Sequence, residues 1–241
     1  MTKLSVNINK IATIRNARGG NTPNLVEAAI KIQEFGGQGI TIHPRPDERH
    51  IRYQDVYDLK PVVSTEFNIE GKPVDSFMEL VLNAKPEQVT LVPDAEDAIT
   101  SNAGWDTIKH FDYLAEVIQT FKSAGIRTSI FLDPNPTLIE SAAKTGADRI
   151  ELYTEMFASE YEKGNLDAIL PYKETAKLAL ENGLAVNAGH DLSLHNIEYF
   201  IREIPAIAEV SIGHALISEA LYLGLENTIQ AYLRKIELAN L

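Results

Sequence analysis

The chain has 241 residues, of which 44% are hydrophobic and 23% are charged, as is typical of a soluble globular protein. It contains no cysteine, which excludes thiolate catalysis, disulfide bonds and cysteine-ligated metals. The formal net charge of −12 argues against a nucleic-acid partner, because phosphate backbones need a basic surface, but it allows a small phosphorylated substrate held by a local group of arginines.

Eight short apolar segments, each followed by a helical pattern, predict alternating strands and helices. Strands are expected at 4–8, 38–43, 62–69, 88–92, 126–132, 148–153, 184–188 and 208–212. Helices are expected at 22–35, 53–58, 73–83, 107–123, 135–144, 166–182, 193–201 and 214–236, with an extra helix in the long segment 155–164.

Glycines suited to a left-handed helix end precede four of these strands, at residues 36, 125, 146 and 183. Repeated helix–glycine–strand returns indicate a parallel sheet. The sequence therefore predicts an α/β fold, a single (β/α)8 TIM barrel that forms one catalytic domain over residues 1–241. No apolar run reaches bilayer length, so we also expect a cytoplasmic protein without a membrane span or export signal.

Polar residues end the first strand, at the rim where such barrels bind their ligands. Alternation along the strand predicts that Asn7 and Asn9 share the lumen side. Arg18 lies in a glycine-flanked loop and can grip a phosphate, whereas Arg15 is interpreted as a surface residue paired with an acid. Lys10 can be a phosphate contact, an amine nucleophile or a solvated rim lysine.

The second and third strands end in candidate acid–base groups. His43 closes the second strand, and imidazole is a natural general base because it titrates near neutral pH. Arg45 is stiffened by a proline on each side, and His50 follows it. Glu70 closes the third strand among apolar neighbours and is a candidate acid or base. The alternatives are a structural histidine and an ion pair between Glu70 and a rim arginine.

Acidic side chains follow the next strands. Glu151 ends the sixth strand and Asp133 follows the fifth. Either acid can orient a catalytic group or pair with Arg127 or Arg149, and we assign Glu151 a supporting role.

The last two strands are followed by glycine–histidine pairs, His190 after Gly189 and His214 after Gly213. Barrels most often bind phosphate in these two loops, through glycine amides and a helix start. His190 would lie beside a bound phosphate and could protonate a leaving oxygen. His195, expected in the next helix, is interpreted as structural.

A metal site is a further alternative. Divalent-ion ligands could come from His43, Glu70, Glu151, His190 and His214. These residues lack the close spacing of metal motifs, and the neighbouring arginines would repel a cation, so the sequence favours acid–base catalysis without a metal.

Taken together, these segments resemble the pyridoxine 5′-phosphate synthase family, barrel enzymes that close the pyridine ring in vitamin B6 synthesis. The resemblance covers nearly the whole chain. It is carried by residues 6–13 with 15–19, 39–43 through 49–51, 68–70, 91–93, 186–190 with 195–196, and 212–215.

The resemblance implies condensation of 1-deoxy-D-xylulose 5-phosphate with 3-amino-2-oxopropyl phosphate to give pyridoxine 5′-phosphate, inorganic phosphate and water. His43 and Glu70 match the family's proton acceptors, and His190 matches its proton donor. The resemblance implies no cofactor, and it implies a homo-oligomer, commonly an octamer.

The resemblance also assigns substrate-binding positions. Asn7 and Arg18 match residues that hold the amino-ketone phosphate. Arg45, His50 and Thr100 match residues that hold the deoxyxylulose phosphate. Gly213 and His214 match a further phosphate-binding pair.

Two departures concern substrate-binding positions. Many members carry Asp-His where this chain has Asn9 and Lys10, so the sugar-phosphate contacts are expected to differ there. A glycine commonly follows the catalytic histidine, whereas here it is Asp191, which could repel phosphate or cap the next helix.

The loop 94–104 is expected to close over the site as a lid. Two rival functions stay open. One is a phosphate-binding aldolase that uses Lys10 as a Schiff-base amine, and the other is a catalytically silent barrel that only binds a phosphorylated metabolite.

Overall fold

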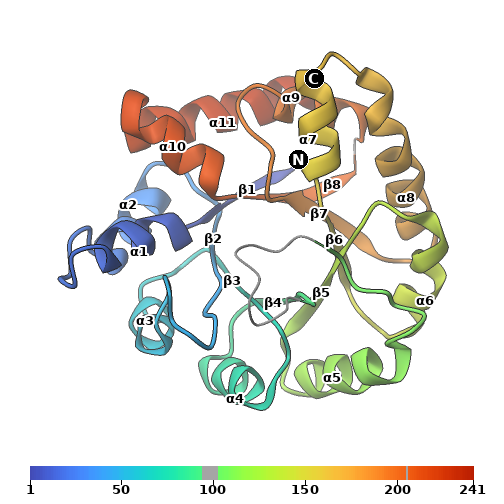
Figure 1. The fold of residues 1–241 in the computed structure, drawn as a ribbon, viewed down its shortest axis with the longest axis horizontal. Helices are drawn as coiled ribbons and strands as arrows, with labels where there is room; N and C mark the ends of the chain where they lie inside the picture. Colours follow the sequence, from blue (N-terminus) through green and yellow to red (C-terminus); the bar gives the residue numbers. More distant parts are fainter. Residues whose placement is uncertain (94–102, 205) are drawn as a thin grey trace.

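A computed structural model describes residues 1–93, 103–204 and 206–241, which form a closed parallel barrel surrounded by helices (Figure 1). Each strand pairs in parallel with the next, and the last pairs with the first. The predicted TIM barrel is therefore confirmed. The strands are β1 (Lys3–Asn7), β2 (Gly39–Ile42), β3 (Glu66–Gly71), β4 (Gln88–Leu91), β5 (Arg127–Leu132), β6 (Arg149–Leu152), β7 (Ala185–Gly189) and β8 (Ile207–Ile212).

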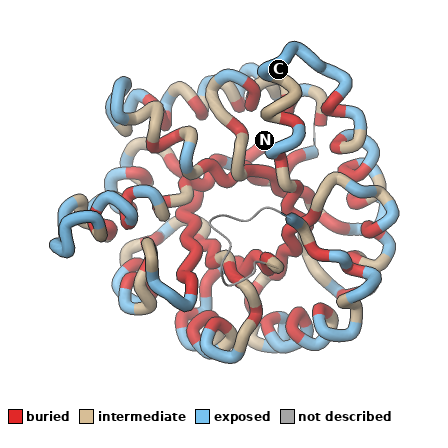
Figure 2. Tube along the Cα trace, viewed as in Figure 1, coloured by how far each residue is buried: buried red, intermediate tan, exposed pale blue. Residues whose placement is uncertain are grey.

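The helices cover the outside of the barrel, and their buried residues face the wall of strands (Figure 2). The extra helix predicted within 155–164 is present as α7. Within the described parts of the chain, the helices are too short or too polar to cross a membrane. They are α1 (Asn9–Asn16), α2 (Leu25–Glu34), α3 (Tyr53–Leu59), α4 (Asp75–Ala84), α5 (Phe111–Ser123), α6 (Ile139–Lys144), α7 (Glu155–Glu162), α8 (Leu170–Glu181), α9 (Ile197–Glu203), α10 (His214–Leu223) and α11 (Leu225–Ala239), with 3-10 turns η1 (Pro136–Leu138) and η2 (Leu166–Ile169).

The segment after β1 differs from the prediction, because the chain enters helix α1 instead of a loop. Ile11, Ala12 and Arg15 are its buried residues, and their spacing places them on one helical face. Asn9 therefore begins a helix rather than continuing the strand alternation.

The third strand begins at Glu66 rather than at residue 62. The amides of Val62 and Val63 both donate to the carbonyl of Leu59 at 3.0 Å, which commits these residues to the turn after α3. The apolar pattern there reflects helix-end packing rather than a strand.

Glycine conformation explains several of the helix ends. The four glycines predicted to end helices have φ between +77° and +97°, as the left-handed end position requires. The helix predicted over 214–236 is instead divided into α10 and α11 at Gly224, whose φ of +80° and ψ of +147° belong to a region that only glycine adopts readily.

The barrel wall separates an apolar outer layer from a polar lumen. The side chains of Ser5 and Thr41 lie 2.8 Å apart across β1 and β2. Thr90 Oγ1 donates to the side-chain oxygen Oδ1 of Asn68 at 3.1 Å across β3 and β4. Because these buried groups satisfy one another, the polar alternation continues through the interior up to the mouth of the barrel.

Candidate active site

A cavity of about 350 Å³ opens at the carboxyl ends of the strands. Among the predicted site residues, Arg18 is exposed after α1 and does not line the cavity, and Thr100 lies outside the described residues. Residues 94–102 of the expected lid also lie outside the described residues. The cavity is lined by Asn7, Asn9, Lys10, His43, Arg45, His50, Glu70, Val92, Phe131, Glu151, His190, Asp191, Ser211, Gly213 and His214.

A hydrogen-bonded chain of two asparagines positions the acid–base pair His43 and Glu70. Asn7 donates through Nδ2 to Glu70 Oε2 at 3.3 Å and accepts from the Asn9 amide at 3.0 Å. Asn9 Oδ1 accepts from the His43 amide at 2.9 Å. Glu70 Oε2 then lies 4.0 Å from His43 Nδ1. Both asparagines reach the cavity as expected, although Asn9 does so from a helix.

The two histidines that follow β2 are held neutral by their surroundings. Burial, helped by the positive charge of Arg45, lowers the pKa of His43 well below its ordinary value. Burial and Arg45 also lower the pKa of His50 to about 4. His50 Nδ1 accepts from the Ile51 amide at 2.9 Å, so its proton is on Nε2. Both rings are therefore proton acceptors or neutral hydrogen-bond donors near pH 7.

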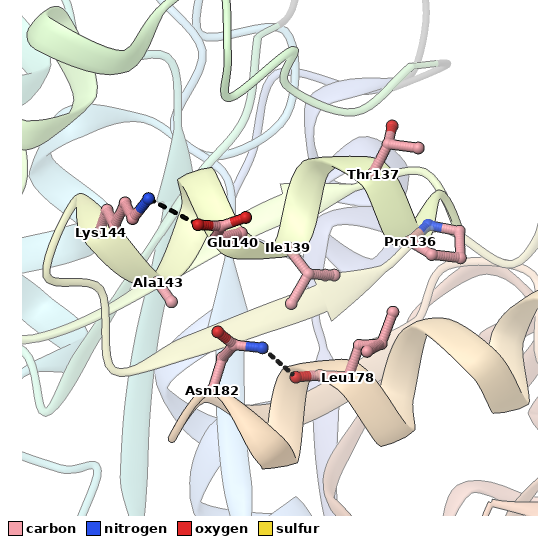
Figure 3. A pocket seen from close by; sticks show the side chains of 8 residues that line it. All are labelled: Pro136, Thr137, Ile139, Glu140, Ala143, Lys144, Leu178 and Asn182. Atoms are coloured by element: carbon pink, nitrogen blue, oxygen red, sulfur yellow. Dashed lines mark hydrogen bonds and ion pairs between the residues drawn. The ribbon is translucent and has the colours of Figure 1, made fainter.

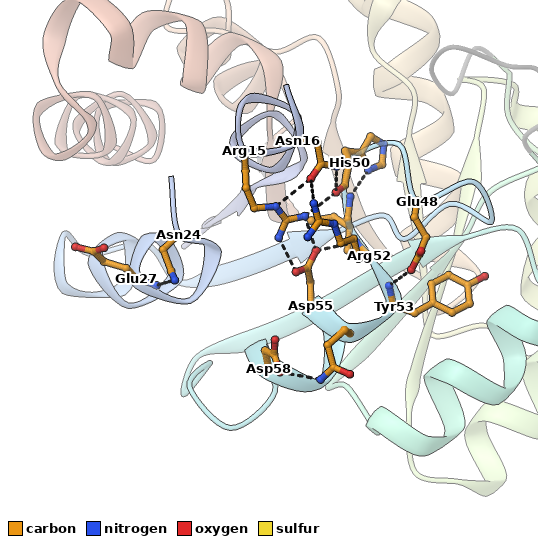
Figure 4. A network of polar contacts seen from close by, with 12 residues as sticks. Arg15, Asn16, Asn24, Glu27, Glu48, His50, Arg52, Tyr53, Asp55 and Asp58 are labelled. Atoms are coloured by element: carbon orange, nitrogen blue, oxygen red, sulfur yellow. Dashed lines mark hydrogen bonds and ion pairs between the residues drawn. The ribbon is translucent and has the colours of Figure 1, made fainter. Parts of the chain in front are cut away.

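A polar network outside the cavity fixes the segment that carries these histidines (Figure 4). Arg15 binds both carboxylate oxygens of Asp55, at 2.6 and 2.9 Å, and donates to the His50 carbonyl at 3.0 Å. Asn16 donates to the same carbonyl at 2.8 Å. Arg15 thus pairs with an acid as predicted, but the prediction that it lies on the surface is wrong, because it is 2% exposed. The bidentate contact between the Arg15 guanidinium and the Asp55 carboxylate fixes the orientation of Arg15, which in turn holds the His50 backbone.

Glu151 lies at the floor of the cavity, 3% exposed. Burial raises its pKa to about 7, and the nearby His190 and a Thr90 hydrogen bond oppose this only in part. Pairing of Glu151 with Arg127 or Arg149 is contradicted, since Arg127 and Arg149 bind other groups at the opposite end of the barrel. A carboxyl poised near neutral pH beside a histidine is a common feature of acid–base sites.

Asp133 and His195 lie outside the cavity. Asp133 Oδ2 accepts from the Gly104 amide at 3.1 Å. His195 is exposed in the turn before α9, with its ring 5.3 Å from that of Tyr161. The structural interpretation of His195 agrees with this position, although the residue precedes the helix.

His190 and Asp191 form a direct contact at the end of β7. His190 Nδ1 lies 2.7 Å from Asp191 Oδ2. The helix-capping alternative for Asp191 is contradicted, because α9 begins at Ile197 with Asn196 as its N-cap residue, and no side chain among the described residues caps this helix.

Three lining residues were not predicted: Val92, Phe131 and Ser211. Ser211 precedes Gly213 by two positions on β8, so strand alternation alone would have placed it toward the lumen. Its buried hydroxyl makes no hydrogen bond within the described residues. The two apolar residues carry no such signal in the sequence.

A second pocket, of about 520 Å³, lies on the outer surface between α6 and α8 (Figure 3). Its charged residues Glu140 and Lys144 pair with each other at 2.6 Å, and Asn182 donates to the Leu178 carbonyl at 2.9 Å. These polar groups are engaged along the helix surfaces. The mouth of the barrel, where polar groups from many strands converge, is therefore the candidate active site.

A metal site is the alternative use of these side chains. In 1–93, 103–204 and 206–241, His, Asp and Glu side chains do not gather in threes in a way that could hold a metal ion. Lys10 and Arg45 line the cavity beside the acids and histidines.

Comparison with known proteins shows which family the chain belongs to. The family described as "Pyridoxal phosphate biosynthesis protein PdxJ" matches residues 4–238. Pyridoxine 5′-phosphate synthases from Christiangramia forsetii and Flavobacterium johnsoniae are 69% and 68% identical to this chain, each over 98% of this chain and all of the relative.

Solved structures share the fold at low identity. A 3-keto-L-gulonate-6-phosphate decarboxylase from Vibrio cholerae aligns over 98% of this chain and 97% of its own, with a TM-score of 0.65 at 12% identity. A phosphoribosylanthranilate isomerase from Thermotoga maritima aligns over 98% and 99%, with a TM-score of 0.62 at 13% identity. These likenesses concern the barrel alone, whereas the full-length matches at high identity establish that the chain belongs to the PdxJ family of pyridoxine 5′-phosphate synthases, which are enzymes.

Proposed function

We propose that this chain condenses 1-deoxy-D-xylulose 5-phosphate with 3-amino-2-oxopropyl phosphate to pyridoxine 5′-phosphate, inorganic phosphate and water, by proton transfer without a metal or cofactor. The main support is that His43, Glu70 and His190, from three strands distant in sequence, line one cavity of about 350 Å³. The names of the relatives suggest the product, and the acid–base groups that line the cavity support this chemistry.

The proposed reaction needs amine attack on a ketone, loss of water, enolisation, phosphate expulsion and ring closure. Each step moves a proton or expels an oxygen leaving group. A neutral imidazole accepts protons, so the lowered pKa of His43 suits it to deprotonation steps. Glu70, 4.0 Å from its Nδ1, takes the second acceptor role. His190 donates a proton to the departing oxygen, with Glu151 in support below it.

The phosphate groups are proposed to bind at the rim. Gly213 and His214 begin the ten-residue helix α10, and a helix N-terminus offers backbone amides and a partial positive charge to an anion. A side chain at Gly213 would come within 3.2 Å of Asn7 Cβ, so glycine also keeps the Asn7–Glu70 contact undisturbed. Arg45, His50, Lys10 and Asn9 are proposed to hold the sugar phosphate.

The remaining assignments are part of the same proposal. Asn7 and Arg18 would hold the amino-ketone phosphate, and Thr100 would contact the deoxyxylulose phosphate. Asp191 lines the cavity and is proposed to contact the bound ligand. We also propose a cytoplasmic homo-oligomer, which sedimentation of the purified protein would test.

The decisive experiment is incubation of the purified protein with both substrates. We expect inorganic phosphate and pyridoxine 5′-phosphate to appear in equal amounts, and neither to appear when one substrate is left out. Binding without turnover would favour the silent barrel. Borohydride trapping of a substrate on Lys10, mapped by mass spectrometry, would favour the aldolase and overturn the proposal.

A further inference from the structure

We propose that Asp191 is a positioning residue for His190, because its carboxylate holds the imidazole Nδ1–H and thereby directs Nε2 to proton transfer in the cavity. The contact that carries this inference is the 2.7 Å distance between His190 Nδ1 and Asp191 Oδ2. The inference rests on the proposed proton-donor role of His190.

The backbone around His190 presets this contact. His190 has a φ of +63°, which non-glycine residues rarely adopt. The Asp191 amide donates to the Gly189 carbonyl at 2.9 Å, closing a three-residue turn with His190 at its centre. The His190 amide donates to the Ser211 carbonyl at 3.3 Å, which ties the turn to β8. An uncommon backbone conformation held from two sides is typical of functional positions.

Thr154, which is buried two residues after the end of β6, stabilises the same turn. Its hydroxyl donates to the Gly189 carbonyl and accepts from the Asp191 amide at 3.2 Å. The Asp191 amide is therefore engaged within the turn, and its side chain is aimed at the neighbouring ring. The turn thus fixes the side chains of His190 and Asp191 relative to each other.

The contact determines which ring nitrogen exchanges protons. An ionised carboxylate only accepts hydrogen bonds, so Nδ1 must carry a proton in both the neutral and the cationic ring. The imidazolium then gives its Nε2 proton to the leaving oxygen, and the neutral ring that remains keeps Nδ1–H on Asp191.

Other titratable groups surround His190 but do not replace Asp191. Glu151 and Tyr153 approach from β6, and the Tyr153 ring stands edge-on at 5.3 Å. His43 lines the same cavity as His190 and interacts with it electrostatically, and Asp133, which follows β5, interacts electrostatically with Tyr153. The pKa of Glu151 is raised to about 7 by burial, so it is only partly ionised near neutral pH. Asp191 places a carboxylate oxygen 2.7 Å from the ring nitrogen of His190.

The test compares Asp191→Asn and Asp191→Ala with the unaltered enzyme. Asparagine keeps a neutral acceptor, whereas alanine removes both acceptor and charge. In both variants we expect the alkaline limb of the kcat/KM profile to move to lower pH, since the ring loses the carboxylate in contact with Nδ1. At pH 7 we expect a fall of about 10-fold in kcat/KM. The matched control, Asp167→Asn on the exposed turn η2, should leave the profile unchanged.

Solid-state ¹⁵N spectra of histidine-labelled protein give a second readout that does not require turnover. The His190 signal, assigned by its loss in His190→Gln, should show a protonated Nδ1 in the unaltered chain and in Asp191→Asn. In Asp191→Ala it should shift toward the other tautomer. If Asp191→Ala fails to fold, Asp191→Asn still decides the question through the pH profile.

Unchanged alkaline limbs in both variants, or a protonated Nε2 and bare Nδ1 in the unaltered chain, would overturn the inference. Failure of the proposed function is distinguishable. It would show as no product from the unaltered enzyme, while the spectra would still report the Nδ1 contact.

Discussion

The two ends of the barrel both gather charged side chains, yet they arrange them differently. At the base, the amino ends of the strands, Glu66 pairs with Arg127, lies 3.6 Å from Arg149 and lies 3.8 Å from Lys3. Arg149 also lies 3.9 Å from Glu209. At the mouth, Glu70 and His43 are 4.0 Å apart on the wall of a cavity.

The two ends differ in which groups neutralise their charged side chains. At the base, opposite charges from several strands neutralise one another, so the protein itself supplies the partners. At the mouth, His43 is kept neutral by burial and Glu151 is poised near neutral pH. The same alternation of inward polar residues thus gives a structural network at one end and groups ready for proton transfer at the other. The variants below should separate activity from stability accordingly.

Removing an acid–base group at the mouth should have the largest effect. We expect His43→Ala and Glu70→Gln each to lower kcat by about 10²- to 10⁴-fold, the contribution typical of one general acid or base. Stability should change little, because these residues line an open cavity. Steady-state phosphate release and urea unfolding measure the two quantities. Near-normal turnover by either variant would remove that residue from the mechanism.

Removing the central carboxylate at the base should have the opposite signature. Glu66→Gln leaves Arg127 and Arg149 without their shared counter-ion, and we expect a loss of about 3 kcal/mol in unfolding free energy with kcat nearly retained. The control is Glu140→Gln, an exposed i,i+4 partner of Lys144, which should cost under about 0.5 kcal/mol. If Glu66→Gln lost as much activity as His43→Ala, the charged network at the base would be required for catalysis at the mouth.

The pH dependence of stability should report Glu209. Burial and the nearby Glu66 raise its pKa to about 8, and Arg149 opposes this only in part. Above the ordinary value of 4.5 the unfolded chain releases this proton, whereas the folded protein keeps it up to about pH 8. Stability should therefore fall as pH rises through this range.

Glu209→Gln should flatten that fall by roughly 1–2 kcal/mol between about pH 5 and pH 8, as measured by urea unfolding at each pH. Mouth variants such as Glu70→Gln should keep the slope of the unaltered protein. An identical slope in Glu209→Gln would mean that another buried carboxyl group, such as Glu151, causes the fall.

The convergence at the mouth was predictable because parallel strands share one carboxyl edge. Strand ends at His43, Glu70 and Gly189 suffice to bring their polar groups to one rim. Helix α1 was not predictable from the same pattern, since its polar residues resemble a loop until a barrel wall covers Ile11 and Ala12.

Contacts between distant residues were also beyond the sequence. Arg15 was expected to pair with an acid, but Asp55 is 40 residues away and its choice depends on how α1 and α3 pack. The aim of Asp191 at His190 depends on a φ of +63°, which neither alternation nor propensity specifies. Periodicity thus determines which residues face the lumen, whereas the partner of each residue is decided by packing.

Removal of divalent metal ions should have the smallest effect on turnover. It tests whether the side chains at the mouth act with substrate phosphates alone or also need a metal ion. Lys10 and Arg45 line the same cavity as Glu70 and the histidines, so a divalent ion would enter against two positive charges. We expect dialysis against a chelator to leave turnover within about twofold of its starting value, because proton transfer needs no Lewis acid. Loss of turnover that is restored by Mg²⁺ or Zn²⁺ would instead make Glu70 and His43 metal ligands. The mouth would then resemble the base, since a bound ion would neutralise the acidic side chains there.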